Sequence, residues 1–333
     1  MIDIHLHLDG SLSEQDFLYL SKKYDIPLGN DFPDNIYVPA DCPSLEDYLK
    51  RFALPGKLLQ TKEALSYVTA SLVRRLHSLG YIYAEIRFAP LLHLEKGLTQ
   101  LGAAKAALGG LKSALKECPG FDANLILCCM RHADETTNLE TIEVARQLKG
   151  TKVVAVDLAG AERLHPSSYY AKVFEKAKEY RLNITIHAGE ATGSDEVMMA
   201  MGNGAMRIGH GVHLSLDPQT VKRVKENDIC FEFCPTSNLQ TKSLKTYQDV
   251  PLRQFMELGI PVTINSDNMT VSNTNAPLEL KHMVETFSLT KEEIKGLFLT
   301  SINHAFIEEK DKEKLRKQLD LKIDEFYERL IKR

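Results

Sequence analysis

The chain begins with IDIHLHLDG at residues 2–10, where apolar and polar side chains alternate before an aspartate and a glycine. Alternation of this kind predicts a β-strand, in which residues two apart point to the same side. His5 and His7 should therefore project together, and Asp9 should lie just beyond the carboxyl end of the strand. Two histidines this close can also occur by chance on a half-buried strand, so the stretch alone leaves a metal site open.

Seven further segments rich in Val, Ile and aromatic residues predict strands at residues 81–88, 123–130, 152–158, 183–188, 206–210, 229–234 and 261–266. Amphipathic helical patterns lie between several of them, at residues 13–24, 63–79, 101–117, 168–181 and 218–227. Eight strands alternating with helices predict an α/β fold of the (β/α)8 TIM-barrel type. The active site of such a barrel lies at the carboxyl ends of its strands.

Residues 31–61 form too long a segment for one barrel connection, and we expect a helical insertion there, after the first strand and over the active-site face. The tail from residue 310 predicts additional C-terminal helices. Helix starts are indicated by three capping pairs, Ser11 with Glu14, Ser44 with Asp47, and Thr290 with Glu293. We find no linker, repeat or low-complexity tract, so we expect one domain over residues 1–333.

Composition narrows the class of partner. With 44% hydrophobic and 26% charged residues, the chain resembles an ordinary globular protein that buries a large core. A net charge of −4 argues against binding to nucleic acid or an anionic membrane, and its apolar runs are too short to span a bilayer. Six cysteines without signs of secretion predict reduced thiols and a cytoplasmic protein. We expect a small-molecule substrate; the oligomeric state stays open between monomer and weak homodimer.

Polar residues recur where other predicted strands end. His187 and Glu190 lie in HAGE, His210 lies between two glycines, and Asp267 and Asn268 lie in NSDN. Three imidazoles and one carboxylate make a ligand set that suits zinc. A two-metal barrel hydrolase usually needs a bridging lysine on a middle strand, and the fourth strand has none past Lys152 at its start. The P-C-x-x-C motif of cytidine-type deaminases is absent. We therefore expect one mononuclear site. The glycines around His210 suggest close approach of the backbone to something bound.

Six motifs, in chain order, carry a family resemblance: HLHLDG at 5–10, LCCMRH at 127–132, VVAVDLAG at 153–160, HAGE at 187–190, IGHG at 208–211 and SDN at 266–268. Together they resemble the adenosine deaminase family of metal-dependent purine deaminases, and they span nearly the whole chain. The resemblance implies hydrolytic deamination of adenosine and 2'-deoxyadenosine to inosine and ammonia. It also implies one zinc ion per chain.

The resemblance assigns roles to the residues at the strand ends. The zinc ligands would be His5, His7, His187 and Asp267. Glu190 would donate a proton to the purine, while His210 and Asp267 would attend the attacking water. A carboxyl group desolvated beneath a purine suits this role, because burial raises its pKa. Glu190 could instead cap the following helix, where carboxylates near free amides are common.

Substrate contacts follow from the same resemblance. Asp9 would face the ribose, His7 would also contact the substrate, and Gly160 and Asn268 would contact the base. Asn268 stands where some relatives carry a second aspartate. An apolar lid near the ribose would be formed by Leu45, Tyr48, Leu49 and Phe52. The helical spacing of these four residues is also that of an ordinary core-facing stripe.

Several neighbouring residues have a structural interpretation. We expect His132, His165 and His213 to be ordinary histidines, Asp157 and Glu162 to be structural hydrogen-bonding groups, and Cys234 to be a small buried side chain. Three other functions stay open. An adenine deaminase would be expected to carry Glu where Asp9 stands, a nucleotide deaminase would need basic groups for the phosphate, and a catalytically dead binding protein would have lost a ligand or the acid.

Overall fold

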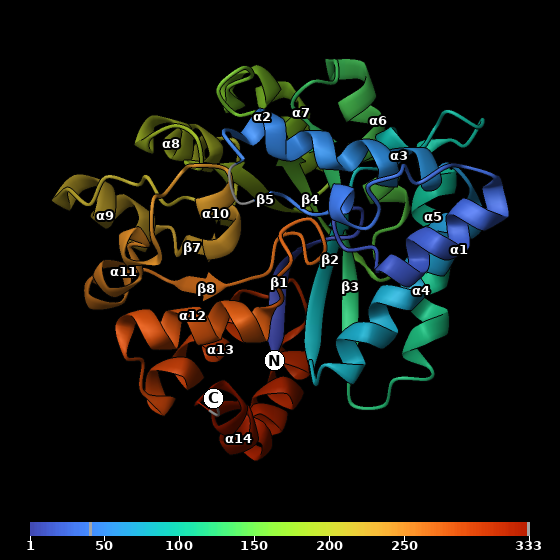
Figure 1. Cartoon of the computed structure of the whole chain (residues 1–333). Coiled ribbons are helices and arrows are strands. Elements are labelled where there is room, and N and C mark those ends of the chain that lie inside the picture. Colours follow the sequence, from blue (N-terminus) through green and yellow to red (C-terminus); the bar gives the residue numbers. More distant parts are fainter. Residues whose placement is uncertain (40–41, 332–333) are drawn as a thin grey trace.

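A computed structural model describes residues 1–39 and 42–331. Its eight parallel strands are hydrogen-bonded in chain order, and a parallel bridge between Leu6 and Asp267 connects the last strand back to the first. The strands are β1 (Ile2–His7), β2 (Tyr83–Phe88), β3 (Asp122–Met130), β4 (Val153–Ala159), β5 (Asn183–Ala188), β6 (Arg207–His210), β7 (Cys230–Phe233) and β8 (Val262–Ile264). This arrangement is the predicted (β/α)8 TIM-type barrel (Figure 1).

Helices surround the strands and bury their apolar outer faces in one extended core. They are α1 (Glu14–Tyr24), α2 (Leu45–Leu49), α3 (Ala53–Leu58), α4 (Lys62–Ser78), α5 (Gln100–Leu115), α6 (Glu135–Gln147), α7 (Ala171–Glu179), α8 (Ser194–Gly202), α9 (Pro218–Glu226), α10 (Pro235–Gln240), α11 (Leu252–Leu258), α12 (Ala276–Phe287), α13 (Lys291–His304) and α14 (Glu309–Ile331). None of the helices within the described ranges has the length and apolar character that crossing a membrane requires.

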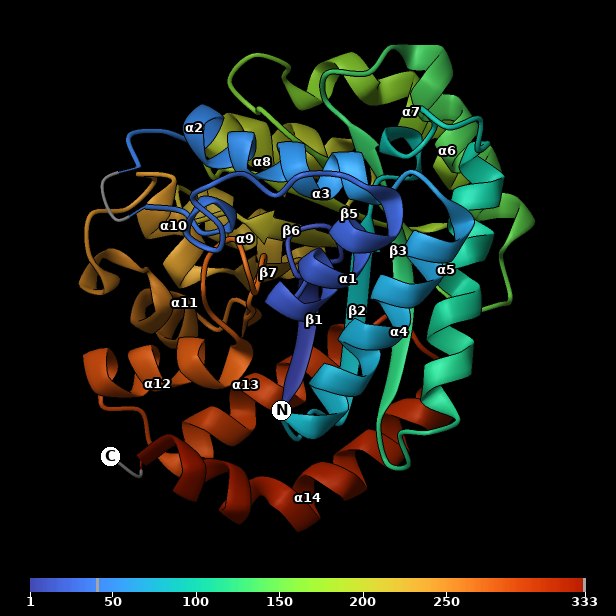
Figure 2. The ribbon, with the colours of Figure 1, turned by 45° about the vertical axis from the view of Figure 1, so that its right-hand side comes forward.

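The helical insertion after the first strand is confirmed. Between β1 and α4 the chain forms α1, two short 3-10 turns, α2 and α3; residues 40–41 of this segment lie outside the described residues. In Figure 2, α2 and α3 lie at the upper end of the barrel, and α14 lies at the opposite end. The insertion therefore covers the carboxyl ends of the strands, and the predicted C-terminal helix α14 packs far from that face.

Reciprocal capping is confirmed for Thr290 with Glu293, and Ser44 is confirmed as the cap of α2, where the Asp47 carboxylate accepts from the Ser44 hydroxyl. Ser44 and Thr290 accept hydrogen bonds from backbone N–H groups at the starts of α2 and α13. The third prediction is wrong, because Ser13, not Ser11, caps α1 and pairs with Asp16. The buried Ser11 hydroxyl instead accepts a hydrogen bond from the backbone of Met269. Ser11 thus connects the end of β1 to the turn after β8.

Candidate active site

Four of the predicted residues form a cluster at the carboxyl ends of the strands. His5 and His7 lie on β1, His187 lies on β5, and Asp267 lies in the turn after β8. Each offers one nitrogen or oxygen atom, and these atoms lie within 4.8 Å of one another. The Nε2 atom of His7 is 3.2 Å from that of His187 and 3.5 Å from a carboxylate oxygen of Asp267. We call these four residues the ligand cluster.

The hydrogen bonds around the cluster fit a divalent cation. His5 Nδ1 lies 2.7 Å from a carboxylate oxygen of Glu232, and His187 Nδ1 lies 3.1 Å from Asp157. Each Nδ1 can donate to its carboxylate, which leaves the lone pair of Nε2 directed into the cluster. The buried Nε2 atom of His5 has no hydrogen-bond partner among the described residues. Three lone pairs and a carboxylate therefore converge where a cation would bind.

Backbone strain accompanies this geometry. Asp267 and His210 adopt left-handed backbone conformations, with φ of 58° and 62°. Such conformations are uncommon for residues other than glycine and carry an energetic cost. The flanking glycines are explained by close packing within the protein. A Cβ atom on Gly209 would lie 3.0 Å from the His5 ring, and one on Gly211 would lie 2.3 Å from Phe231. Packing against His5 and Phe231 accounts for these glycines, and their approach to a bound group stays a prediction.

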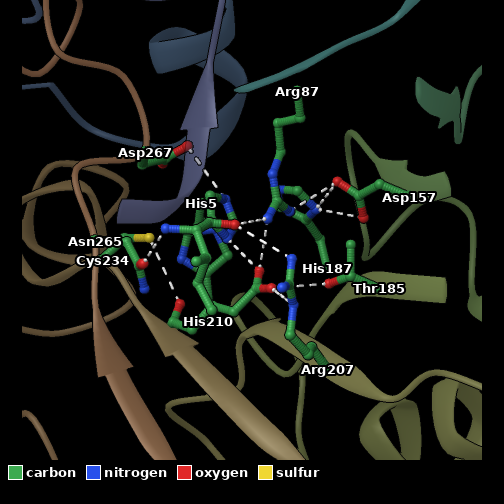
Figure 3. A network of polar contacts seen from close by, with 12 residues as sticks. His5, Arg87, Asp157, Thr185, His187, Arg207, His210, Cys234, Asn265 and Asp267 are labelled. Carbon is green, nitrogen blue, oxygen red and sulfur yellow. Dashed lines mark hydrogen bonds and ion pairs between the residues drawn. The ribbon is translucent and has the colours of Figure 1, made fainter. Parts of the chain in front are cut away.

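Beneath the cluster lies a buried charge network that the sequence interpretation missed. Arg87 donates at 3.0 Å to Asp157, the carboxylate that holds His187 (Figure 3). Arg87 also donates at 2.9 Å to Glu232, the carboxylate that holds His5. Burial opposes ionisation of both acids, yet neighbouring guanidinium and imidazole groups hold the pKa of each carboxyl below its ordinary value. Asp157 has the structural role we expected. Arg87 connects the carboxylates that orient two members of the cluster.

A sequence signal for this network did exist. Glu85 and Arg87 lie two residues apart in the otherwise apolar segment YAEIRF, and Glu232 interrupts CFEF in β7. Their spacing places Glu85 and Arg87 on one side of β2. Charged residues inside buried strands require partners, and Arg207 on β6 supplies one by contacting both Glu85 and Glu232. Such positions predict an internal ion network, although not which strands provide each partner.

Glu190 lies beside the cluster in a desolvated environment. Its side chain is buried, one carboxyl oxygen accepts a hydrogen bond from the Thr241 hydroxyl at 3.2 Å, and the other lies 3.7 Å from His210 Nε2. Burial, with smaller contributions from the carboxylates of Asp267 and Glu162, raises the pKa of Glu190 to about 8. The group therefore retains a proton near neutral pH, as a general acid requires.

The backbone amides that follow β5 are bound by a different carboxylate and not by the Glu190 side chain. Glu162 accepts hydrogen bonds from the backbone N–H groups of residues 189–192. Helix α8 begins only at Ser194, after Gly193, which provides no side-chain cap. Glu162 therefore satisfies the amides of this loop, and the Glu190 side chain faces the cavity.

His210 is held by a partner that the sequence did not identify. Asn238 donates from Nδ2 to His210 Nδ1 at 3.1 Å, which places the remaining ring proton on Nε2. Burial lowers the pKa of His210 to about 3, so the ring is neutral. Its Nε2 atom, which carries the proton, lies 3.7 Å from a carboxyl oxygen of Glu190.

One cavity of about 330 Å3 brings the predicted residues together. Its lining includes His7, Asp9, Leu45, Tyr48, Leu49, Phe52, Gly160, His187, Glu190, His210, Asp267 and Asn268. Of the predicted residues, only His5 is absent from this lining, because it is fully buried behind it. His132 and His165, which we interpreted as ordinary, also line the cavity, whereas Cys234 is a buried thiol as expected.

The apolar residues of the insertion were interpreted above either as a lid near the ribose or as a core-facing stripe, and the structure shows features of both. Leu45, Tyr48 and Leu49 on α2, followed by Phe52, line the cavity. They also pack in a small apolar cluster with Val271, in the turn after β8. This stripe is thus a packing surface and a cavity wall at once. The Asp9 carboxyl also lines the cavity; its Oδ1 atom has no hydrogen-bond partner in the described part of the chain, and burial raises its pKa to about 6.

Comparison with known proteins agrees with this site. A family model described as adenosine deaminase matches residues 1–322. The chain belongs to the adenosine deaminase family. An adenosine deaminase of Haemophilus ducreyi is 44% identical over 95% of this chain and 94% of its own length. One of Clostridium botulinum is 40% identical over 95% of this chain and 97% of its own length. Membership of the adenosine deaminase family makes this protein a metal-dependent hydrolytic deaminase.

Several solved structures of other proteins share the fold of this chain. An adenine deaminase from Arthrobacter aurescens has a TM-score of 0.88 at 22% identity, covering 97% of this chain and 98% of its own. The N6-methyl-AMP deaminase of Arabidopsis thaliana has a TM-score of 0.85 at 24% identity, covering 96% of this chain and 95% of its own. A zinc-bound amidohydrolase from Burkholderia ambifaria has a TM-score of 0.89 at 20% identity, covering 99% of this chain and 92% of its own. At these identities the likeness concerns the fold alone.

Proposed function

We propose that this protein deaminates adenosine, and 2'-deoxyadenosine, to inosine and ammonia. The observation that carries the proposal is the convergence of three features on one cavity: the ligand cluster, the buried carboxyl of Glu190 and the unpaired oxygen of Asp9. The names of the two relatives from Haemophilus ducreyi and Clostridium botulinum support the same substrate.

We propose that one zinc ion per chain is held by His5, His7, His187 and Asp267. This nitrogen-rich set suits zinc, and the amidohydrolase from Burkholderia ambifaria contains zinc in the same fold. A zinc ion in this cluster would supply a water molecule that is nucleophilic at neutral pH.

The residues around the cluster would then complete the reaction. Attack on the ring carbon that carries the amino group places negative charge on the neighbouring ring nitrogen, and Glu190 would protonate that nitrogen. The Nε2–H group of His210 would orient the attacking water, because Asn238 occupies its other nitrogen. Asp267 would accept a hydrogen bond from that water as well as holding the metal. Gly160 would present backbone to the purine, and the apolar wall of α2 would exclude solvent.

Competing substrates are disfavoured by the cavity lining. Adenine and N6-methyl-AMP are the substrates named for two structural neighbours. The described residues that line the cavity include no lysine or arginine to pair with a phosphate. Free adenine would leave the buried Asp9 oxygen without a donor. Measuring the rate of ammonia release from adenosine, 2'-deoxyadenosine, adenine and AMP tests this preference for the nucleoside. Faster deamination of adenine or AMP than of adenosine would contradict it.

Asp9 provides a sharper prediction within that panel. Asp9→Ala should lower kcat/KM for adenosine by about 10- to 150-fold, because it removes a charged acceptor for a ribose hydroxyl worth about 1.5–3 kcal/mol. The low activity with adenine should change little, since adenine has no ribose. Asp9→Asn, which keeps the size and one acceptor, serves as the matched control and should lose less. An equal loss for both substrates in Asp9→Ala would show that Asp9 does not contact the ribose.

We also propose that residues 1–333 form one domain located in the cytoplasm. The family match over residues 1–322 supports the first point. The second is supported by the six cysteines, which are free and buried, as is usual in a reducing compartment.

A further inference from the structure

A buried hydrogen-bonded chain connects the insertion to the turn after β8. Asn268 Nδ2 donates to the Tyr48 hydroxyl at 2.8 Å, and that hydroxyl lies 2.7 Å from the hydroxyl of Ser272. All three side chains are buried, with Tyr48 2% and Asn268 3% exposed. Tyr48 and Asn268 both line the cavity, although they come from α2 and from the far end of the barrel sequence. This contact is therefore the point where the insertion meets the turn at the cavity wall.

The surroundings of Asn268 fix which way its amide group points. Its Oδ1 atom lies against Gly10, where a Cβ atom would come within 1.9 Å of it. A carbonyl oxygen tolerates the C–H group of Gly10, whereas an NH2 group in that place would face no acceptor. Among the described residues Oδ1 has no hydrogen-bond partner, which agrees with this close packing. The NH2 group therefore points toward Tyr48, and one of its two hydrogens remains available.

We propose that Tyr48 is a positioning residue that holds the amide of Asn268 with its free N–H directed at the purine. The five-membered ring of the purine carries a nitrogen that accepts hydrogen bonds, so this amide reads the base. Tyr48 can accept from Asn268 because α2 packs against the turn after β8, so the insertion takes part in base recognition through this one hydroxyl. The proposal rests on the purine nucleoside substrate proposed above.

Packing alone is the competing explanation, since Tyr48 also contacts Val271 and Cys42 in the apolar cluster. Tyr48→Phe separates the two explanations, because it keeps the aromatic ring and removes only the hydroxyl. Leu49→Ala is the matched control. Leu49 lines the same cavity from the same helix and packs in the same cluster, and of these two residues it is Tyr48 that accepts the hydrogen bond of the Asn268 amide.

The test compares adenosine with 7-deazaadenosine, in which the accepting nitrogen is replaced by carbon. In the wild type, kcat/KM should favour adenosine by about 5- to 150-fold, since the analogue leaves a buried donor unpaired. Tyr48→Phe and Asn268→Ala should each remove most of this preference, and the double variant should lose no more than either one. Leu49→Ala should lower kcat/KM for both substrates and keep their ratio. Thermal unfolding of each variant checks that the fold is retained.

Two results would overturn the proposal: a wild type that does not discriminate between the two substrates, or a Tyr48→Phe variant that keeps the wild-type ratio, whether its kcat/KM values are unchanged or fall equally. Failure of the proposed function would look different, as absence of ammonia release from adenosine in the wild type. In that case calorimetry on the zinc-loaded protein can compare the binding affinities of inosine and 7-deazainosine, which differ in the same ring nitrogen. Equal affinity of the wild type for these two ligands would equally overturn the role of Tyr48.

Discussion

Glu190→Gln should lower kcat for adenosine by about 10²- to 10⁴-fold, the usual contribution of a general acid. The amide has nearly the same shape as the protonated carboxyl but cannot deliver a proton to the ring nitrogen. Glu190 lies outside the ligand cluster, and its side-chain contact with Thr241 can be kept by the amide oxygen. The variant should therefore keep its fold and its metal while turnover is lost.

Metal content, thermal unfolding and kcat of this variant should be measured together. Glu162→Gln is an informative comparison, because that carboxylate holds the loop amides at residues 189–192 and acts on Glu190 only by contributing to its raised pKa. We expect it to lower the thermal stability more than Glu190→Gln does. A Glu190→Gln enzyme with kcat within tenfold of the wild type would remove Glu190 from the mechanism.

Arg87→Met should destabilise the fold by about 3–5 kcal/mol, the usual cost of breaking a buried ion pair by removing one partner. Arg87 is fully buried and donates to both Asp157 and Glu232. Methionine fills similar space but leaves Asp157 without a guanidinium partner. The same change should weaken metal retention, because the two carboxylates orient His187 and His5.

Chemical denaturation and the rate of zinc transfer to a chelator measure these two effects. The matched control is Arg74→Met, which breaks the surface pair with Glu117, whose side chains are 47% and 55% exposed. It should change stability by less than about 1 kcal/mol. If Arg87→Met stayed within 1 kcal/mol of the wild type and kept its metal equally long, the network would not support the cluster.

The fold could be predicted from the sequence because its strongest signals are local. The period-two pattern of IDIHLH and its seven counterparts marks each strand, and the observed strands lie within the predicted segments or within a residue of them. Polar residues at strand ends were brought together because parallel strands end on one face. The cap of α1 was assigned two residues too early, to Ser11, although Ser13 and Asp16 have the same spacing as Ser11 and Glu14. The tertiary contact of Ser11 with Met269 could not be seen in the sequence.

Side-chain partners were harder to predict because they depend on which strands meet inside the barrel. Glu232 lies 227 residues from His5, and Asn238 contacts His210 from a helix that no sequence pattern had indicated. Periodicity reports the face on which a side chain lies but not what it meets there. The same limit applied to Glu162 and Glu190, two acids whose different roles depend on which one faces the loop amides.

The central claim is that one zinc ion in the ligand cluster enables this chain to deaminate adenosine. The most direct test titrates zinc into the chelator-treated protein and follows the rate of ammonia release from adenosine. We expect the rate to rise from near zero and to level off at one equivalent per chain, because the cluster provides one set of four ligands. Full activity without metal, a plateau only at two equivalents, or no ammonia at any zinc concentration would contradict the account.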